Sequence, residues 1–501
     1  MAKPKRECFV VEFPLKVEKW QKDVLNKRLT VAATIYNQCV AKTQGMFREM
    51  SKTKCYRAIE AELAESRPKK PEPNRKKTPR EVELYKQLGD IRKEHGFTEY
   101  DFMTLAAQVG EPYKHLIDST ARQKIGSRLW TAWSRFFFGD GEAVRFKKRE
   151  NYNSVEGKSN KAGIRFKDGK IEWMGLSVPV VIEKDNPFEQ MSFDHDISYC
   201  RIIRRWVRGQ AKFYVQIVFK GFVPPKIDKR TGEFKHGTGQ GRVGLDIGTQ
   251  TLAVASGTKV ALVELADRVN DINAKKRCIE RYMDRSRRAV NPSNYNPDGT
   301  PKKGALRWVK SNRYKKAQLE LREMRRKEAA VRRYQHHCLA NEIIALGDEY
   351  VVESMSFKGL QRKAKKTEVS EKTGRNKRKK RFGKSIGNKA PALFVELLEQ
   401  KAHGKLLRVA TGSFKASQYD HIGDCYVKKK LGQRWAHVGK HRVQRDLYSA
   451  FLLMNADSSL MTADTKLCNE TFNNFLILHD QAIARLEKMK SLPSSMGIKV
   501  A

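Results

Sequence analysis

The sequence predicts a mixed α/β protein with several domains, and three observations predict it. From residue 242 onward, short apolar strand patterns alternate with helical patterns, which is typical of an α/β sheet domain. Residues 17–138 carry helical periodicity, whereas residues 139–225 carry short β-type runs separated by Gly, Asn, Asp and Pro. A chain of 501 residues is long enough for several domains and at least one substantial core.

The N-terminal part predicts one strand followed by a long helical region. Residues 8–14 form a short strand pattern that ends at a proline, and apolar spacing predicts a helix over residues 17–50. Residues 67–80 are rich in Pro and Lys and predict a loop, after which helical patterning runs over residues 81–138. That region ends in aromatic residues whose spacing favours a buried helix face over a platform for stacking nucleobases. They are Trp130, Trp133, Phe136, Phe137 and Phe138.

The next region predicts a small antiparallel barrel or sheet. Its β-type runs are residues 144–147, 164–167, 178–182 and 213–219. Basic residues surround Trp206, and such a surface suits contact with a nucleic-acid backbone, although a basic sheet surrounded by solvent is an alternative. These basic residues are Arg201, Arg204, Arg205 and Arg208.

The C-terminal half predicts strands and helices in alternation. The predicted strands are residues 243–246, 252–256, 349–353 and 406–410. The predicted helices are residues 309–346, 390–403, 445–457 and 469–490. Residues 361–384 are dense in Lys and Arg and predict a loop, and residues 411–445 predict irregular structure.

The charge of the chain favours a polyanionic partner. The chain has 101 Lys and Arg against 56 Asp and Glu, a formal net charge of +45. Such an excess repels itself in a compact protein, and nucleic acid would relieve that repulsion. A membrane surface is the alternative, but no apolar run approaches the roughly 18–20 residues of a bilayer span and no signal peptide follows Met1. We therefore expect a nucleic-acid partner and no membrane.

The cysteines indicate a reducing compartment. The chain has 8 cysteines, and no two of them form a CxxC pair. Scattered single thiols without a secretion signal are typical of a reduced, cytoplasmic protein.

Three acidic residues differ from the other charges in their context. Asp246 and Glu353 each end an apolar strand pattern, and Asp446 begins an apolar helix pattern. Open α/β sheets place their sites at such strand ends, and carboxylates that meet there repel each other unless a hard divalent cation joins them. Each acid alone is equally well explained as a cap or turn residue. Together they predict a site for two Mg²⁺ ions about 3.5–4 Å apart, as in phosphodiester hydrolysis.

The residues around these acids resemble a known family. Asp246-Ile247-Gly248 with Ala253, Val352-Glu353-Ser354-Met355, and Arg445-Asp446 with Ala450 resemble the three RuvC motifs of transposon-encoded TnpB proteins and compact type V CRISPR effectors. The run Asn312-Arg313-Tyr314-Lys315-Lys316 is similar to the segment that follows the first motif. The resemblance covers roughly residues 240–460 and extends weakly to the N-terminal half.

The resemblance implies an RNase H-like (RuvC) nuclease domain, plus an N-terminal helical recognition domain inserted in a β-barrel wedge domain. It places the wedge barrel at residues 1–16 and 139–235 and the helical recognition domain at residues 17–138. The nuclease domain would comprise residues 236–410 and 446–501, interrupted by a degenerate target-strand-loading segment at residues 411–445.

The resemblance also implies the roles of particular residues. Asp246, Glu353 and Asp446 would be the catalytic residues and the metal ligands. The expected nucleic-acid contacts are Asn312, Arg313, Lys315, Lys316, Arg204, Arg205, Lys147 and Lys148.

The sequence departs from the family in two places. The family usually carries two CxxC pairs between its second and third motifs, which form a zinc ribbon, whereas that segment here contains only Cys425. His421, Cys425, His437 and His441 have a spacing near that of a zinc finger. Histidines in a basic segment more often contact phosphate or solvent, so we expect no zinc. Tyr448 and Ser449 stand where the family commonly has Asn and Ala, which would alter the surroundings of the site without removing a ligand.

The implied function is that of a magnesium-dependent, RNA-guided DNA endonuclease. Its partners would be a guide RNA and target double-stranded DNA, bound by a monomer or by a homodimer on one guide RNA. It would act in the prokaryotic cytoplasm, at the nucleoid. Two alternatives remain open, namely a nuclease-silent, RNA-guided DNA-binding repressor and a guide-free RuvC-type nuclease or transposase.

Overall fold

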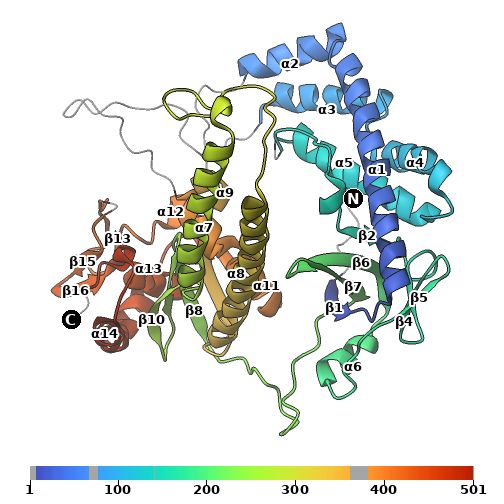
Figure 1. Ribbon diagram of the computed structural model, residues 1–501. Coiled ribbons are helices and arrows are strands. Elements are labelled where there is room, and N and C mark those ends of the chain that lie inside the picture. The colour runs from blue at the N-terminus through green and yellow to red at the C-terminus, as the bar shows by residue number, and fades with distance from the viewer. Residues whose placement is uncertain (1–6, 67–76, 140, 362–381, 431, 500–501) are drawn as a thin grey trace. The chain divides into compact units, whose positions relative to one another are not determined.

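The computed structural model describes residues 7–66, 77–139, 141–361, 382–430 and 432–499 (Figure 1). The chain forms two compact units, Met1–Glu233 and Phe234–Ala501. None of the helices in the described part of the chain has the length and apolar composition that crossing a membrane requires.

The first unit contains an antiparallel sheet that joins distant parts of the sequence. Its strand order is β1 (Cys8–Pro14), β7 (Gln210–Lys220), β6 (Ile197–Val207) and β2 (Ser154–Glu156). The register between β1 and β7 runs from Cys8 opposite Lys220 to Pro14 opposite Tyr214. A second sheet comprises β3 (Arg165–Lys167), β4 (Lys170–Trp173) and β5 (Leu176–Pro179). Since β1 pairs with β7, the helices between β1 and β2 form an insertion within one sheet.

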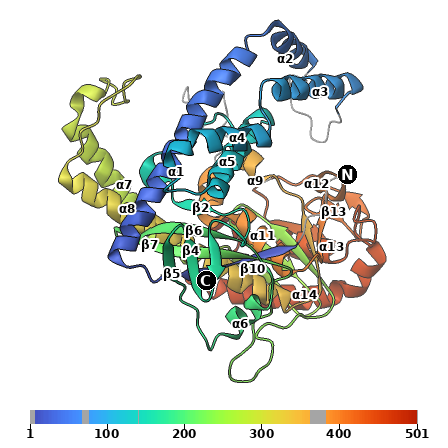
Figure 2. The same cartoon turned by 90° about the vertical axis from the view of Figure 1, so that its right-hand side faces the viewer.

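The described part of that insertion contains five helices of α type. They are α1 (Lys19–Met50), α2 (Lys54–Ser66), α3 (Pro79–Glu94), α4 (Glu99–Val109) and α5 (Ser119–Phe137). Asp118 caps α5 by accepting a hydrogen bond from the Ala121 amide at 3.0 Å, and it also accepts one from the Trp173 indole at 2.8 Å. One side chain therefore begins α5 and ties it to the small sheet. α2 and α3 lie side by side in both views (Figures 1 and 2).

The predicted strand at residues 144–147 is wrong, because side chains of α1 take its backbone hydrogen bonds. Asn37 donates to the Lys147 carbonyl and accepts from the Lys147 amide, both at 2.8 Å. Gln44 donates to the Val144 carbonyl at 2.9 Å. With its polar groups satisfied in this way, the segment needs no neighbouring strand.

The second unit is built on a five-stranded mixed sheet. Its order is β10 (Val260–Glu264), β9 (Thr251–Ala255), β8 (Arg242–Ile247), β11 (Glu349–Glu353) and β12 (Leu406–Val409). The strands β10, β9 and β8 pair antiparallel, whereas β8, β11 and β12 pair parallel. Parallel neighbours need long crossovers, which are supplied by helices. They are α7 (Val269–Val290), α8 (Asn312–Ile344) and α11 (Pro391–Lys401).

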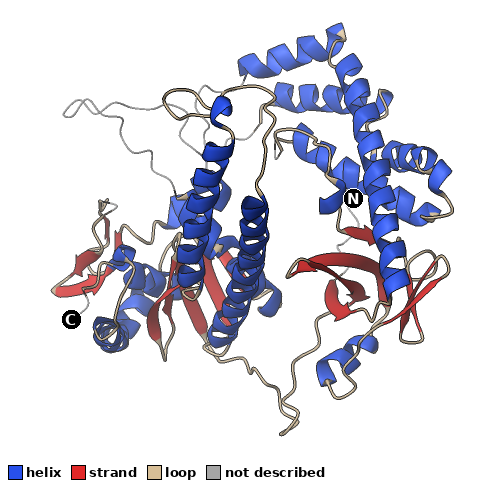
Figure 3. Cartoon of the chain, in the orientation of Figure 1, coloured by secondary structure: helices blue, strands red, loops and turns tan. Residues whose placement is uncertain are grey.

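Helices cover both faces of this sheet. One face, which includes Leu245 and Val352, packs with Phe394 and other apolar residues of α8 and α11. The other, which includes Val351, packs with Phe451 and its neighbours on α13 (Arg445–Met454) and α14 (Thr465–Glu487). Helices flank the strands on both sides (Figure 3), and burial on both faces explains the nearly continuous apolar runs of the strands. α7 and α8 lie side by side in both views.

The segment before α13 contains two small hairpins where the sequence predicts irregular structure. They are β13 (Tyr419–Asp420) with β14 (Cys425–Tyr426), and β15 (Trp435–Val438) with β16 (His441–Gln444). Short helices complete the two units. They are α6 (Pro187–Phe193), α9 (Phe357–Gln361), α10 (Gly383–Lys389) and α12 (Thr411–Phe414). Most of the loop predicted at residues 361–384 lies outside the described residues.

Candidate active site

Strand register brings Asp246 and Glu353 together. In the parallel pair, Leu245 lies opposite Val352, so the next residues of the two strands, Asp246 and Glu353, are neighbours at the strand ends. Side chains alternate between the faces of a sheet. Leu245 and Val352 face α8 and α11, so Asp246 and Glu353 lie on the face covered by α13.

Close packing brings α13 to the same place. A Cβ atom on Gly244 would overlap the Ala450 carbonyl oxygen and the Met454 amide nitrogen of α13, so the helix lies directly on β8 at this glycine. The Gln444 side chain caps α13 by accepting from the Leu447 amide at 2.8 Å. Asp446 is the acidic residue of the first turn. The helix thus holds the third carboxylate on the face that carries the other two.

Asp246 interacts electrostatically with the carboxylates of Asp446 and Glu353. Burial raises the pKa of Asp246 well above its ordinary value, and the carboxylates of Asp446 and Glu353 raise it further. A hydrogen bond from the Ser449 hydroxyl and the charge of Arg445 partly oppose this rise in the pKa of Asp246. Burial also raises the pKa of Glu353 to about 6, against a hydrogen bond from the backbone of Ala416. The negative charges of Asp246 and Glu353 are therefore only partly offset by the groups around them.

Arginines neutralise Asp446. Arg434 Nη1 lies 3.3 Å from Asp446 Oδ2, and Arg445 Nη2 lies 3.1 Å from Asp446 Oδ1. Among the residues that the structure describes, no three or more His, Cys, Asp or Glu side chains are placed to hold a metal ion. At this site, both oxygens of Asp446 accept hydrogen bonds from guanidinium groups.

The chemistry of the carboxylates nevertheless fits a hard divalent cation. Asp246 and Glu353 are buried acids whose raised pKa values reflect the free-energy cost of their negative charge. A divalent cation offsets that cost, and carboxylate oxygens are the protein ligands that Mg²⁺ takes. Asp246, Glu353 and Asp446 are the residues that would hold it.

The two departures after Asp446 have different surroundings. The Ser449 hydroxyl can donate its one hydrogen either to the Arg445 carbonyl, 3.0 Å away, or to the Asp246 carboxylate, so it belongs to the site. The Tyr448 hydroxyl lies 2.6 Å from His421 Nδ1 and belongs to the core around α14.

The four residues with zinc-finger spacing differ in burial and packing. His421 is buried, and its ring packs edge-on against Phe472 at 4.7 Å. His441 also packs against Phe472, whereas Cys425 and His437 are exposed. Packing against Phe472 thus accounts for the positions of His421 and His441.

Arg204 is not a surface residue, and its expected contact with nucleic acid is corrected accordingly. It is 6% exposed, and its guanidinium donates to Asn153 at 3.1 Å and to Asn26 at 2.9 Å. Burial lowers the pKa of Arg204. It joins α1 to the sheet from inside, because strand alternation turns it inward while the neighbouring Arg205 turns outward. Arg205 is exposed and pairs with Glu12 at 2.5 Å.

The other expected contact residues lie at the surface. Lys147 and Lys148 are exposed, and so are four residues in the first two turns of α8. Those four are Asn312, Arg313, Lys315 and Lys316. Their binding to nucleic acid stays a prediction.

A basic hollow that the sequence did not reveal lies in the first unit, between α5 and the strands β2 and β6. Its volume is about 1020 Å³. Two acids, Glu99 and Glu156, also line it. Its basic side chains are Lys124, Arg128, Arg135, Arg145, Lys147 and Arg201. The spacing of Lys124, Arg128 and Arg135 on one side of a helix was the available signal.

Comparisons with known proteins give structural neighbours only. No protein-family model and no curated protein matches the chain. A cryo-EM structure of a Cas12f1–sgRNA–target DNA complex is similar over 90% of this chain and 99% of that chain, with 11% identity and a TM-score of 0.42. A CRISPR-Cas12f ternary complex is similar over 89% of this chain and 99% of that chain, with 11% identity and a TM-score of 0.26. The solved structures to which this chain is similar thus include compact type V CRISPR effectors.

Proposed function

We propose that this chain is an RNA-guided DNA endonuclease that hydrolyses phosphodiester bonds at Asp246, Glu353 and Asp446. The observation that carries the proposal is the placement of three acids on one side of the sheet, at the ends of β8 and β11 and at the start of α13, where Asp246 is close enough to feel the charge of the other two. A concentrated negative site is unusual in a chain of net charge +45, and a bound cation would give it a function.

The charge of the rest of the molecule supports nucleic acid as the substrate. Among its described lining residues, the hollow beside α5 has six cationic side chains against two acids. A guide RNA would neutralise much of the net charge and supply sequence specificity by base pairing, while the protein contacts duplex shape and backbone.

The chain's own residues would hold the cation and position the phosphate. Asp246 and Glu353 supply carboxylate oxygens from the sheet, and Ser449 orients Asp246 through its hydroxyl. Arg434 and Arg445 carry positive charge beside Asp446, where a phosphate could also accept their hydrogen bonds. Two bound Mg²⁺ ions would supply a nucleophile at neutral pH and stabilise the leaving oxygen.

The test is cleavage of guide-matched DNA by Asp246→Ala, Glu353→Gln and Asp446→Ala variants. We expect each to lose cleavage and to retain guided DNA binding, because binding uses other surfaces. Glu470→Gln, an exposed acid on α14, is the matched control and should cleave normally. Normal cleavage by all three site variants would refute the proposal.

A nuclease-silent, RNA-guided DNA-binding protein is the second candidate, and the pairing of Asp446 with two arginines favours it. Comparing cleavage in Mg²⁺ with cleavage in EDTA separates the two functions. Sequencing RNA that copurifies with the full-length chain tests the guide in both cases, since a guide-free nuclease would carry no defined RNA.

A further inference from the structure

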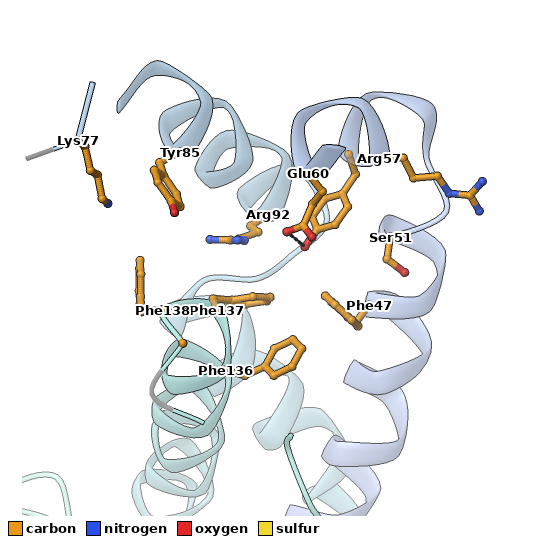
Figure 4. A pocket seen from close by; sticks show the side chains of 12 residues that line it. Phe47, Ser51, Arg57, Glu60, Lys77, Tyr85, Arg92, Phe136, Phe137 and Phe138 are labelled. Atoms are coloured by element: carbon orange, nitrogen blue, oxygen red, sulfur yellow. Dashed lines mark hydrogen bonds between the residues drawn. The ribbon is translucent and has the colours of Figure 1, made fainter. Parts of the chain in front are cut away.

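A second hollow lies in the first unit, where the end of α1 meets α2, α3 and the end of α5 (Figure 4). Its volume of about 740 Å³ falls within the range of about 300–1,000 Å³ that is common for small-molecule sites. All of its lining residues belong to the helical insertion, far in sequence from the carboxylates.

Aromatic rings form one wall of this hollow, and they differ in how firmly they are packed. Phe136 and Phe137 pack against Phe47 with ring centroids 5.3 and 6.0 Å apart. Phe138, at the end of α5, is 74% exposed. The predicted buried face is therefore only partly correct, because Trp133 lies in the core while Phe138 presents its ring to solvent.

Cationic groups face these rings. The Arg92 guanidinium lies 4.3 Å above the Phe137 ring, and Lys77 Nζ lies 3.9 Å from the centre of the Tyr85 ring. Figure 4 shows Lys77, Tyr85 and Arg92 on the side of the hollow opposite Phe137 and Phe138. Arg57 also lines the hollow, but its guanidinium points away from the rings (Figure 4). Among the described lining residues, Glu60 is the acid, and it accepts a hydrogen bond from the Tyr56 hydroxyl. The lining is thus both aromatic and net positive.

We infer that this hollow binds one unpaired nucleotide of a nucleic-acid strand. Its base would stack on Phe138, and its phosphate would lie beside Lys77 and Arg92. The combination of an exposed aromatic ring with cations is how single strands are bound without sequence preference. The net positive lining favours a polyanion over a second copy of a chain whose own charge is +45. This inference rests on the nucleic-acid partner of the proposed function, and it specifies where an unpaired nucleotide is held.

The test uses nucleic-acid-free, full-length protein in EDTA with short single strands that carry one 5-iodouracil. Separate experiments with DNA strands and with RNA strands show whether the bound nucleotide comes from DNA or from RNA. We expect photo-crosslinks on the peptide that contains Phe138, and about fivefold or greater weakening of binding by Phe138→Ala. Phe138→Trp should restore both the affinity and the crosslink, because it keeps a stacking surface.

The matched control is Tyr100→Ala, which removes another ring that is 73% exposed in the same unit. Since both side chains are at the surface, both alanine variants should keep the wild-type melting temperature. Equal binding by the two variants, with crosslinks elsewhere, would overturn the inference. So would a Phe138→Ala variant that binds normally but changes from dimer to monomer in light scattering, because the hollow would then serve protein association.

These outcomes are separate from the test of the proposed function. If the wild-type protein showed no Mg²⁺-dependent cleavage, the proposed nuclease function would be refuted, while the inferred nucleotide site would still stand. Normal cleavage combined with no effect of Phe138→Ala would refute only the nucleotide site.

Discussion

Three carboxylates of similar chemistry have different partners in this protein. Asp246 bonds the Ser449 hydroxyl and Glu353 accepts from the Ala416 backbone, whereas Asp446 accepts from two guanidinium groups. The two acids on the sheet therefore carry most of the uncompensated charge, and Asp446 is the one whose partners must move for it to take part in a metal site.

The raised pKa of Glu353 predicts how its substitution changes stability. Between its ordinary value of 4.5 and its folded value of about 6, the folded protein holds a proton that the unfolded chain has released. The contribution of Glu353 to the free energy of unfolding therefore falls as pH rises through this window, by at most about 2 kcal/mol. We expect metal-free Glu353→Gln to be more stable than wild type above this window, and the gain to vanish below it.

Denaturant unfolding in EDTA, on both sides of the window, measures this difference. Glu470→Gln should show no comparable gain, since Glu470 is exposed. A Glu353→Gln variant that is less stable at neutral pH would show that the ionised carboxylate stabilises the metal-free fold.

Arg434 predicts a change in metal affinity. Its Nη1 atom lies 3.3 Å from Asp446 Oδ2, and the pair is partly buried. Removal of this cation frees one ligand oxygen, so Arg434→Gln should bind Mn²⁺ about two- to fivefold more tightly in isothermal titration calorimetry. Arg442→Gln is the control, because Arg442 is exposed and its guanidinium stacks on Trp435 at 4.5 Å. Weaker binding by Arg434→Gln alone would mean that this arginine orients the ligand.

At the scale of elements, the contact between β8 and α13 decides where the third acid lies. The helix can approach the strand only where the strand has no side chain, and Gly244 provides that position. Two residues later the same face of the strand carries Asp246. The close packing of α13 and the placement of the proposed catalytic acids thus depend on one short stretch of β8.

Gly244→Ala is expected to disturb both the packing of α13 on β8 and the position of Asp446. The added methyl group would overlap the backbone of α13, so the helix must shift, at a cost of roughly 1–3 kcal/mol in the free energy of unfolding. The shift also moves Asp446, so cleavage should fall more than stability alone explains. Gly257→Ala has open space around its Cβ position and a turn location, and it should change neither quantity by much. Unfolding and cleavage measured on both variants check this, and normal cleavage by Gly244→Ala would contradict it.

At the scale of the whole molecule, the large net positive charge is the main electrostatic influence on stability. The net charge of +45 is distributed over two compact units, and many of the basic residues are exposed. Self-repulsion on this scale destabilises the nucleic-acid-free protein more than any single ion pair stabilises it.

Screening should therefore stabilise the free protein. We expect its melting temperature to rise when NaCl increases from low concentration to about 0.3 M, because the Debye length falls below the spacing of many surface charges. An uncharged osmolyte at equal osmolarity is the control for general solvent effects. A melting temperature that falls with salt would show that ion pairs, rather than repulsion, control the stability of the folded state.

Local sequence patterns predicted many of the elements and singled out the three acids, but they did not predict α7 or β6. The strand at residues 349–353 is predicted to its exact bounds. Its three apolar residues are flanked by a glutamate on each side, and so short a run fits a strand better than a helix. The strand predicted at residues 144–147 is wrong, because its hydrogen-bond partners are side chains of α1 about 100 residues away. No local pattern contains that information.

The sequence by itself determined the charge of the chain, the alternation of strands and helices, and three acids whose surroundings resemble RuvC motifs. Only the tertiary structure decided that Asp446 pairs with Arg434, that Arg204 is buried, and that Phe138 is exposed beside cations. The physical reason is that periodicity reports which face of an element is apolar, whereas the partner of each polar group depends on strand register and helix packing between residues far apart in the chain.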